Sequence, residues 1–555
     1  MRRFLTALLL TASFVVSLPP TYAQRAAEKL KKGALSVTAQ RGVDTITAAQ
    51  IRDYLTFIAS DEMEGRDTPS RGLDTTAKFI AMSLSRWGFK PAGDNGSFLQ
   101  RIELRRNRMD GGQTTVDFNG STLNSGTDYL ALSGTGDISG PLVFAGNGWF
   151  IKSKQMDAYK GIDAKGKIAI VFGTSTNFPP RGVSRSELGK QGEDYLNAVD
   201  YARKMGVIGL IMLPDYQYLT AWEQNRRRLM ERGSTVVAKF QPPTTETSLP
   251  AIVVSPQVAN SLFAGESQNA AAIFNGGASG TLPDPFPLNT QKKLTASIGG
   301  KSEIITTQNV VAIWEGSDPV LKNEYVALGA HYDHVGICAP GTADPICNGA
   351  DDDGSGTTAL FSMAEALAKA PTRPKRSTLF VWHCGEEKGL WGSRYFTEYP
   401  TVPLDHIVTQ INIDMIGRSK KEGDTLPRNA NLTGPDAVYL IGSTMMSTEL
   451  GELVNAVNKS YLNITYDTTY DDPKDPNRFF YRSDHYNYAK KGIPIIFYFD
   501  GVHEDYHRPG DSPDKIDYQK MEKITRTVYM TLWELADRAA RPKVDKPLPA
   551  QLSGS

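Results

Sequence analysis

The sequence predicts an α/β fold in which a mostly parallel-centred sheet carries helices on both faces. Four apolar and partly β-branched runs have the length of strands, and they lie at 325–329, 378–383, 406–413 and 493–499. Helical patterns such as 357–368 and 519–537 separate or follow these runs. Repeated alternation of strand and helix is typical of parallel sheets covered by helices.

Composition and charge limit the possible functions. The chain has 555 residues and 40% hydrophobic content, which suffices for a large core and more than one domain. Lys plus Arg and Asp plus Glu number 61 each, so no overall field would attract nucleic acid or an anionic membrane. We therefore expect a neutral or mixed substrate and no nucleic-acid partner.

The first residues predict a signal peptide over 1–23. Arg2 and Arg3 precede the apolar run 4–18, and the small-residue site ends at Ala23, where we expect cleavage. The alternative is a membrane anchor, but the run is shorter than the ~20 residues of a spanning helix. We expect a periplasmic or extracellular protein with no stable membrane insertion after cleavage.

The pattern changes along the chain and predicts an insertion. Residues 41–120 begin with helices and read as the first part of one domain, and its main part follows at 299–540. Between them, 121–298 has short strands with turn residues, which predicts a smaller inserted α+β domain. The Pro-rich segment 541–555 is predicted to be a flexible tail.

Metal-type side chains follow the predicted strands. They are His331, one aspartate of the run Asp351, Asp352 and Asp353, the pair Glu386 and Glu387, Asp414, and His507. Two cations a few ångströms apart need one shared ligand, two further ligands each and a free carboxylate that moves protons. Ligands of parallel sheets bind beyond the carboxyl ends of the strands, where most of these residues fall. The order therefore predicts a two-metal hydrolase.

Each motif also has an ordinary interpretation. The aspartate run could be a solvated turn that caps the next helix, and the glutamate pair could be a helix start. Asp414, however, ends a buried strand, where an unpaired carboxylate is expensive. Asp333 lies close to His331 and could hold the tautomer of a ligating imidazole.

The cysteines fit an oxidising compartment. Cys338 and Cys347 lie close together in a loop rich in Gly, Pro and Asp, where a disulfide could close a short ring, and the alternative is two free thiols. Cys384 lies in an apolar run, which indicates a buried small hydrophobe and not a nucleophile.

Five ordered motifs carry a family resemblance. They are His-Tyr-Asp at 331–333, Gly-Ala-Asp-Asp-Asp-Gly-Ser-Gly at 349–356, Gly-Glu-Glu-Lys-Gly-Leu-Trp-Gly-Ser at 385–393, Asn-Ile-Asp-Met at 412–415 and Tyr-His-Arg-Pro-Gly-Asp at 506–511. Together they resemble the secreted two-zinc aminopeptidases, which include aminopeptidase Y and bacterial leucyl aminopeptidase and are related to glutamate carboxypeptidase. This resemblance implies the zinc exopeptidase fold. The stretch 159–168 resembles part of a protease-associated domain.

The resemblance also implies roles for two zinc ions. His331 and Asp414 would bind one ion, Glu387 and His507 the other, and Asp352 would bridge them, because the family's bridging residue stands three before the serine of its Asp-Xaa-Xaa-Ser-Gly pattern. Glu386 would then be the general base.

Two further roles follow from the same resemblance. Tyr506 resembles the phenol that stabilises the oxyanion in some members, and the alternative is a packing tyrosine. Arg482 would support that tyrosine or contact substrate.

The expected function is hydrolysis of the N-terminal bond of peptides that have a free N-terminus. Two alternatives stay open. One is a different zinc enzyme on the same scaffold, either a carboxypeptidase, which needs cationic residues for the substrate carboxylate, or a glutaminyl cyclase, which works with one zinc. The other is a non-catalytic, receptor-like binding module, although no ligand position is missing.

Overall fold

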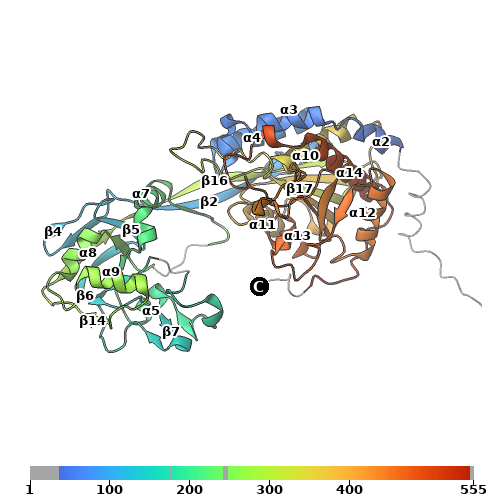
Figure 1. The fold of residues 1–555 in the computed structure, drawn as a ribbon. Coiled ribbons are helices and arrows are strands. Elements are labelled where there is room, and N and C mark those ends of the chain that lie inside the picture. Colours follow the sequence, from blue (N-terminus) through green and yellow to red (C-terminus); the bar gives the residue numbers. More distant parts are fainter. Residues whose placement is uncertain (1–36, 175–177, 242–247, 550–555) are drawn as a thin grey trace, which may run out of the picture. The chain divides into compact units, whose positions relative to one another are not determined.

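The computed structural model describes residues 37–174, 178–241 and 248–549 (Figure 1). These residues form two compact units. Unit 1 combines the chain up to Ile102 with the chain from Thr306 onward, and unit 2 is Glu103–Ile305. The predicted signal peptide lies outside the described residues. Among the described helices, none is long and apolar enough to cross a membrane.

The sheet of unit 1 has a parallel centre. Its main strands, in spatial order, are β2 (Leu99–Met109), β16 (Gly300–Trp314), β18 (Ser377–His383), β17 (Tyr325–His331), β19 (Ile407–Ile413), β22 (Ile495–Phe499), β20 (Ala437–Ile441) and β21 (Thr465–Asp467). Strands β18, β17, β19 and β22 run parallel to one another. The flanking strands β16 and β20 run antiparallel to their neighbours. The predicted parallel-centred α/β sheet is confirmed.

The central strands are buried throughout because helices cover both faces. Every residue of β18, β19 and β22 is buried, so these strands are predominantly apolar and do not alternate between apolar and polar residues.

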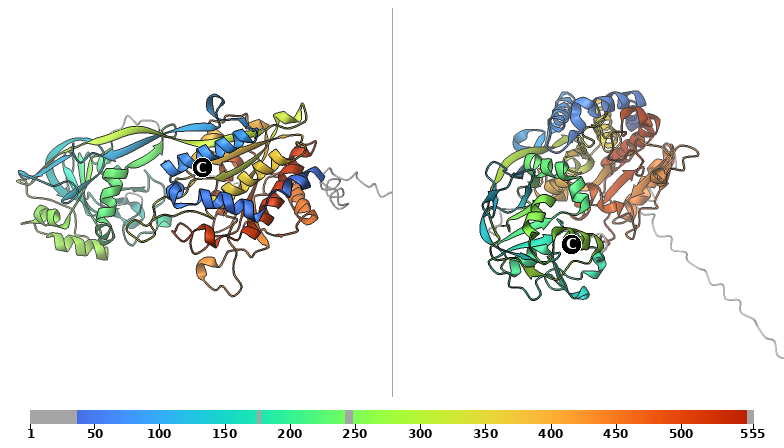
Figure 2. Two further views of the ribbon diagram at one scale, coloured as in Figure 1. Left: turned by 90° about the horizontal axis from the view of Figure 1, so that it is seen from above. Right: turned by 60° about the vertical axis from the view of Figure 1, so that its left-hand side comes forward.

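One helical layer contains α3 (Ala48–Ile58), α4 (Arg71–Arg86), α10 (Gly354–Lys369) and α14 (Tyr518–Asp537). Phe361 of α10 joins this layer, since its ring lies 4.6 Å from that of Tyr54 and 5.2 Å from that of Phe79. Seen from above in Figure 2, the blue, yellow and red helices of the layer lie side by side. The short helices α11 (Trp391–Glu398) and α13 (His485–Ala489) pack on the opposite face (Figure 1).

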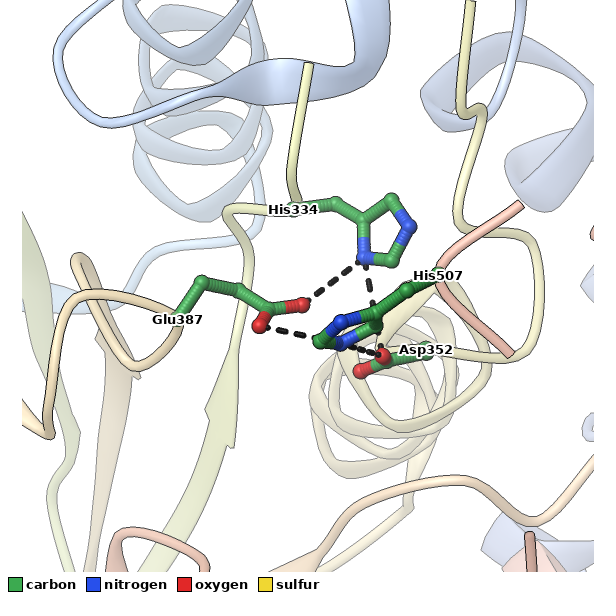
Figure 3. Close-up of side chains that lie close together, drawn as sticks. All are labelled: His334, Asp352, Glu387 and His507. Atoms are coloured by element: carbon green, nitrogen blue, oxygen red, sulfur yellow. Dashed lines mark ion pairs between the residues drawn. The ribbon is translucent and has the colours of Figure 1, made fainter. Parts of the chain in front are cut away.

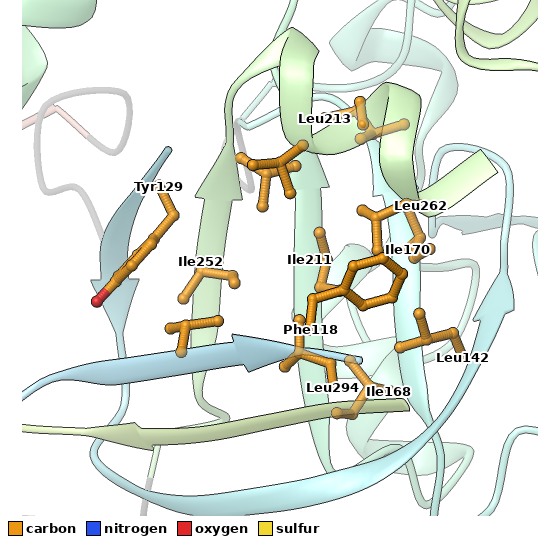
Figure 4. Close-up of a cluster of buried hydrophobic side chains, with 14 of the residues drawn as sticks. Phe118, Tyr129, Leu142, Ile168, Ile170, Ile211, Leu213, Ile252, Leu262 and Leu294 are labelled. Atoms are coloured by element: carbon orange, nitrogen blue, oxygen red, sulfur yellow. The ribbon is translucent and has the colours of Figure 1, made fainter. Parts of the chain in front are cut away.

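Unit 2 has its own sheet and core. Strands β6 (Gly136–Phe144), β9 (Ile168–Phe172), β11 (Gly209–Leu213) and β13 (Ala251–Val254) are parallel neighbours, and antiparallel strands flank them. Helices α8 (Pro256–Phe263) and α9 (Ala270–Ser279) pack against each other. Figure 4 shows Ile170, Ile211, Ile252 and Leu262 in one buried cluster. Its identity as a protease-associated domain stays a prediction.

The unit boundaries differ from the predicted limits of 121 and 298. The division falls at Glu103 and Ile305 because β2 and β16 are long strands that continue through the change in composition.

The predicted tail also differs where the structure describes it. Arg541 bonds to Glu324 at 2.8 Å, and the backbone N–H of Lys543 donates to Glu449 at 3.0 Å. Residues 550–555 of this segment lie outside the described part of the chain.

Candidate metal centre

The ends of three neighbouring strands bring the predicted ligands together. His331 is the last residue of β17, and Asp414 directly follows β19. Glu386 and Glu387 follow β18 by three and four residues. Because these strands are parallel, their carboxyl ends meet at one edge of the sheet.

A first group consists of His331, Asp352 and Asp414. His331 Nε2 lies 3.3 Å from Asp352 Oδ1 and 3.6 Å from Asp414 Oδ1. All three residues are buried, and their ligand-type atoms lie within 4.8 Å of one another. Such a group can hold a cation.

A second group consists of His334, Asp352, Glu387 and His507 (Figure 3). His507 Nε2 lies 3.1 Å from Asp352 Oδ2 and 3.0 Å from Glu387 Oε2. His334 Nδ1 lies 3.0 Å from Glu387 Oε1 and 3.6 Å from Asp352 Oδ2. This group also has the residue types and spacing of a metal site.

Asp352 belongs to both groups and turns a different oxygen to each. Oδ1 faces His331, whereas Oδ2 faces His334 and His507. A carboxylate placed in this way can bridge two cations.

The polar atoms of this centre are better suited to binding a cation than to forming hydrogen bonds with one another. Atoms in it that have no hydrogen-bond partner are Asp352 Oδ2, Glu387 Oε1, His507 Nε2 and both ring nitrogens of His334. Unpaired buried polar atoms are expensive. Burial by itself would lower the pKa of His507, but Asp352 and Glu387 outweigh it and raise that pKa to about 10. The donor set and its negative charge therefore suit divalent metal ions.

The other two aspartates of the run point elsewhere. Asp351 accepts the N–H of Gly417 at 2.6 Å, and its second oxygen lies 3.3 Å from His503 Nε2. Asp353 caps α10 by accepting the N–H of Gly356 at 2.8 Å. Of the three, Asp352 alone faces both groups, and its role as the bridging ligand stays a prediction.

Glu386 lies beside the first group without belonging to either. Its Oε2 is 4.0 Å from His331 Nε2, and its side chain is largely buried. Burial raises the pKa of Glu386 well above its usual value, while the charge of His331 acts in the opposite direction. A carboxylate in this position can take up a proton.

A small pocket opens onto the first group. Its lining consists of His331, Asp352, Glu386 and Asp414, the polar residues Arg482, Ser483 and Tyr506, and the apolar side chains of Met415, Phe479, Phe497, Phe499 and Val502. Tyr506 stacks on His507 with ring centroids 3.9 Å apart. Burial raises the pKa of the Tyr506 phenol above its usual value, so the hydroxyl keeps its proton at neutral pH. Tyr506 and Arg482 thus share the pocket with Glu386.

Asp333 contacts both His331 and Glu386. The His331 Nδ1 atom lies 3.1 Å from the backbone oxygen of Asp333 and 3.7 Å from its Oδ1. The N–H of Glu386 donates to the same carboxylate at 3.2 Å. With Nδ1 donating to the carbonyl, Nε2 of His331 is free to act as a ligand.

A disulfide joins Cys338 and Cys347, whose Cα atoms lie 5.7 Å apart. The resulting ring lies directly before Asn348 in the chain. Cys384 is a buried free thiol.

His334 is the member of the centre that sequence reasoning missed. It lies three residues after His331, and the predicted role in this motif went to the aspartate between them, which could hold the tautomer of His331. The only local signal was the His-Xaa-Xaa-His spacing, which by itself does not show that the loop turns the second imidazole back toward Glu387.

The profile described as peptidase family M28 matches residues 309–532. That range contains both groups and Glu386. This segment belongs to peptidase family M28.

Three curated proteins are each about a quarter identical to part of this chain. A probable zinc metalloprotease of Pyrenophora teres f. teres is 26% identical over 43% of this chain and 53% of its own length. Leucine aminopeptidase 1 of Sclerotinia sclerotiorum is 26% identical over 39% and 54%, respectively. Aminopeptidase YwaD of Bacillus subtilis is 24% identical over 47% and 52%. The chain thus spans about half the length of these relatives.

A solved structure shares the fold over a longer range. The aminopeptidase from Aneurinibacillus sp. strain AM-1 covers 91% of this chain and 98% of its own, with 16% identity and a TM-score of 0.50. At this identity the similarity shows the fold alone.

Proposed function

We propose that this protein is a zinc-dependent aminopeptidase that hydrolyses the N-terminal bond of peptides. One observation carries the proposal: Asp352 presents one oxygen to each of two ligand groups, and the free carboxylate of Glu386 lines the pocket beside them. The names of two similar curated proteins, leucine aminopeptidase 1 and aminopeptidase YwaD, support it.

Two zinc ions would be held by this centre. His331 and Asp414 would bind one ion, Glu387 and His507 the other, and Asp352 would bridge them. When bound, the ions would polarise the scissile carbonyl and lower the pKa of a water from ~16 toward ~7.

Glu386 then acts as the general base. Its position 4.0 Å from His331 Nε2 places its carboxylate at the edge of the first group, where it can take a proton from that water. The same carboxyl group passes the proton to the leaving amine. Glu387 cannot do this, because both of its oxygens face imidazoles.

Tyr506 stabilises the oxyanion. It lines the same pocket as Glu386, and its hydroxyl stays protonated because burial raises its pKa. A protonated phenol can donate a hydrogen bond to the negative oxygen that develops in the transition state.

The substrate enters with a free α-amine. An acidic group of the pocket such as Glu386, together with the second zinc ion, would hold this amine, which a blocked N-terminus does not offer. The predicted signal peptide over 1–23 and the disulfide between Cys338 and Cys347 support export from the cytoplasm as part of the proposal.

The position of Arg482 favours a carboxypeptidase as the second candidate function. It lines the pocket, its guanidinium stands 5.1 Å from the Phe479 ring, and it forms no ion pair with a described carboxylate. A cation in this position could bind a substrate carboxylate. End-group preference separates the two functions.

The test compares aminoacyl anilides with free and with blocked N-termini, together with zinc content, for the wild type and Glu386→Ala. We expect two zinc ions per chain in both proteins, cleavage of the free substrates only, and a loss of about 10²–10⁴-fold in the variant. Glu452→Gln, at an exposed position on α12 (Thr448–Ser460), serves as the control. Equal cleavage of blocked substrates, or a fully active Glu386→Ala protein, would contradict the proposal.

A further inference from the structure

His334 has no role in the ligand set carried over from the family. It is fully buried, and neither ring nitrogen has a hydrogen-bond partner among the described residues. Its Nδ1 atom nevertheless lies 3.0 Å from Glu387 and 3.6 Å from Asp352. We infer that His334 is a fourth protein ligand of the metal position formed with Glu387 and His507.

The spacing of the four ligand atoms supports this assignment. Four ligands at zinc distances of about 2.0–2.1 Å from a tetrahedral centre lie about 3.3 Å from one another. His334 Nδ1 and His507 Nε2 lie 3.6 and 3.1 Å from the same oxygen of Asp352, Oδ2, and each lies 3.0 Å from one of the two oxygens of Glu387. Figure 3 shows both imidazoles directed at the same space between Glu387 and Asp352. One cation can therefore contact all four residues.

The alternative is that His334 only orients Glu387 through a hydrogen bond. The structure contains no such bond, because His334 Nδ1 and Glu387 Oε1 both lack a hydrogen-bond partner although they are 3.0 Å apart. A buried nitrogen and a buried oxygen that face each other without such a bond are satisfied by a cation between them.

This assignment makes the two metal positions unequal. The position of His334, Asp352, Glu387 and His507 has four protein ligands, which is the closed arrangement of structural zinc sites. The position of His331, Asp352 and Asp414 has three, which is the arrangement of catalytic sites that keep one position open. Glu386 lies beside this three-ligand position. The four-ligand position therefore holds its ion tightly, and the three-ligand position exchanges its ion and receives water and substrate.

The inference rests on the proposed function in requiring two cations, but it makes a separate claim about their affinities. Zinc binding to metal-free protein is measured by calorimetric titration for the wild type, His334→Ala and His334→Asn. The asparagine amide can still donate a hydrogen bond to Glu387, yet it is a poor zinc ligand. His406→Asn, at a partly exposed position outside both groups, is the matched control.

We expect one tight and one weaker zinc-binding step in the wild type and in His406→Asn. His334→Asn should weaken the tight step by more than the 10–100-fold typical of residues that only orient a ligand. The weaker step should change little. The circular dichroism spectrum and melting curve of each metal-free variant establish that it is folded, and His334→Gln provides a second substitution if His334→Ala does not fold.

Cobalt absorption gives a readout independent of activity. One equivalent of Co²⁺ should give the intense visible bands of a four-coordinate ion in the wild type and weaker bands in His334→Asn. Unchanged binding and bands in His334→Asn would overturn the ligand role, and two equal steps in the wild type would overturn the asymmetry. Failure to bind a second ion would contradict the proposed function as well, whereas normal metal steps without peptidase activity would contradict that function alone.

Discussion

The carboxylate of Asp511 accepts the backbone N–H of Asp352 at 3.1 Å. It also accepts the N–H of Asp351 at 3.1 Å. Both amides are buried, so Asp511 holds the segment whose side chain links the two ligand groups.

Asp511→Ala should therefore lower both stability and zinc affinity. Each buried N–H left without an acceptor costs about 1–3 kcal/mol. Asp511→Asn, whose amide oxygen can still accept, should recover part of the loss. Denaturant unfolding and zinc titration measure the two effects, with the exposed Asp53→Asn as control. An Asp511→Ala protein as stable as the control would show that this contact does not position Asp352.

Tyr506→Phe should reduce kcat by about 10²-fold or more, because it removes one hydrogen-bond donor to the oxyanion. KM and zinc content should stay near the wild-type values, since Tyr506 belongs to neither ligand group. Steady-state kinetics and metal analysis test this, with the exposed Tyr216→Phe as control. An unchanged kcat would leave Tyr506 as a packing residue.

Acid should destabilise the fold partly through His485. This imidazole is fully buried and stacks on Phe497, and burial lowers its pKa to about 3. Between about pH 6.5, where an exposed histidine titrates, and pH 3, only the unfolded chain binds this proton. The contribution of His485 to stability is therefore present above pH 6.5 and is lost as the pH falls, at about 1.4 kcal/mol per pH unit.

The measurement is the free energy of unfolding against pH for metal-free wild type and His485→Phe. The phenyl ring keeps the stacking without a titrating group. The free energy of unfolding of the variant should therefore fall less steeply than that of the wild type as the pH is lowered below about 6.5. If the free energy of unfolding falls equally steeply with decreasing pH in the two proteins, His485 is excluded as a source of the pH dependence.

The paired substitution Cys338→Ser and Cys347→Ser should destabilise the protein by about 3 kcal/mol, because the disulfide closes a short loop of the unfolded chain. Cys384 is buried and should not replace either partner. Denaturant unfolding of the variant under oxidising conditions, compared with wild type with and without reductant, tests the effect. A wild type that loses no stability in reductant would contradict it.

Sequence reasoning reached the fold through patterns that are local. Strand β17 and helix α10 are each coded by a continuous run of residues, and a parallel sheet with covered faces demands such apolar runs. The boundary between the two units was harder to predict from the sequence, because β2 and β16 continue past the change in composition that marks the insertion.

The sequence by itself determined that metal-type residues follow successive parallel strands, because a strand's end and the residue after it are adjacent in the chain. Only the tertiary structure decided which side chains face one another. Asp351, Asp352 and Asp353 are neighbours in sequence, yet one contacts His503, one joins both ligand groups and one caps a helix. His334 enters the centre through the path of its loop. Such choices depend on backbone direction and on contacts between distant segments, which residue type and spacing do not specify.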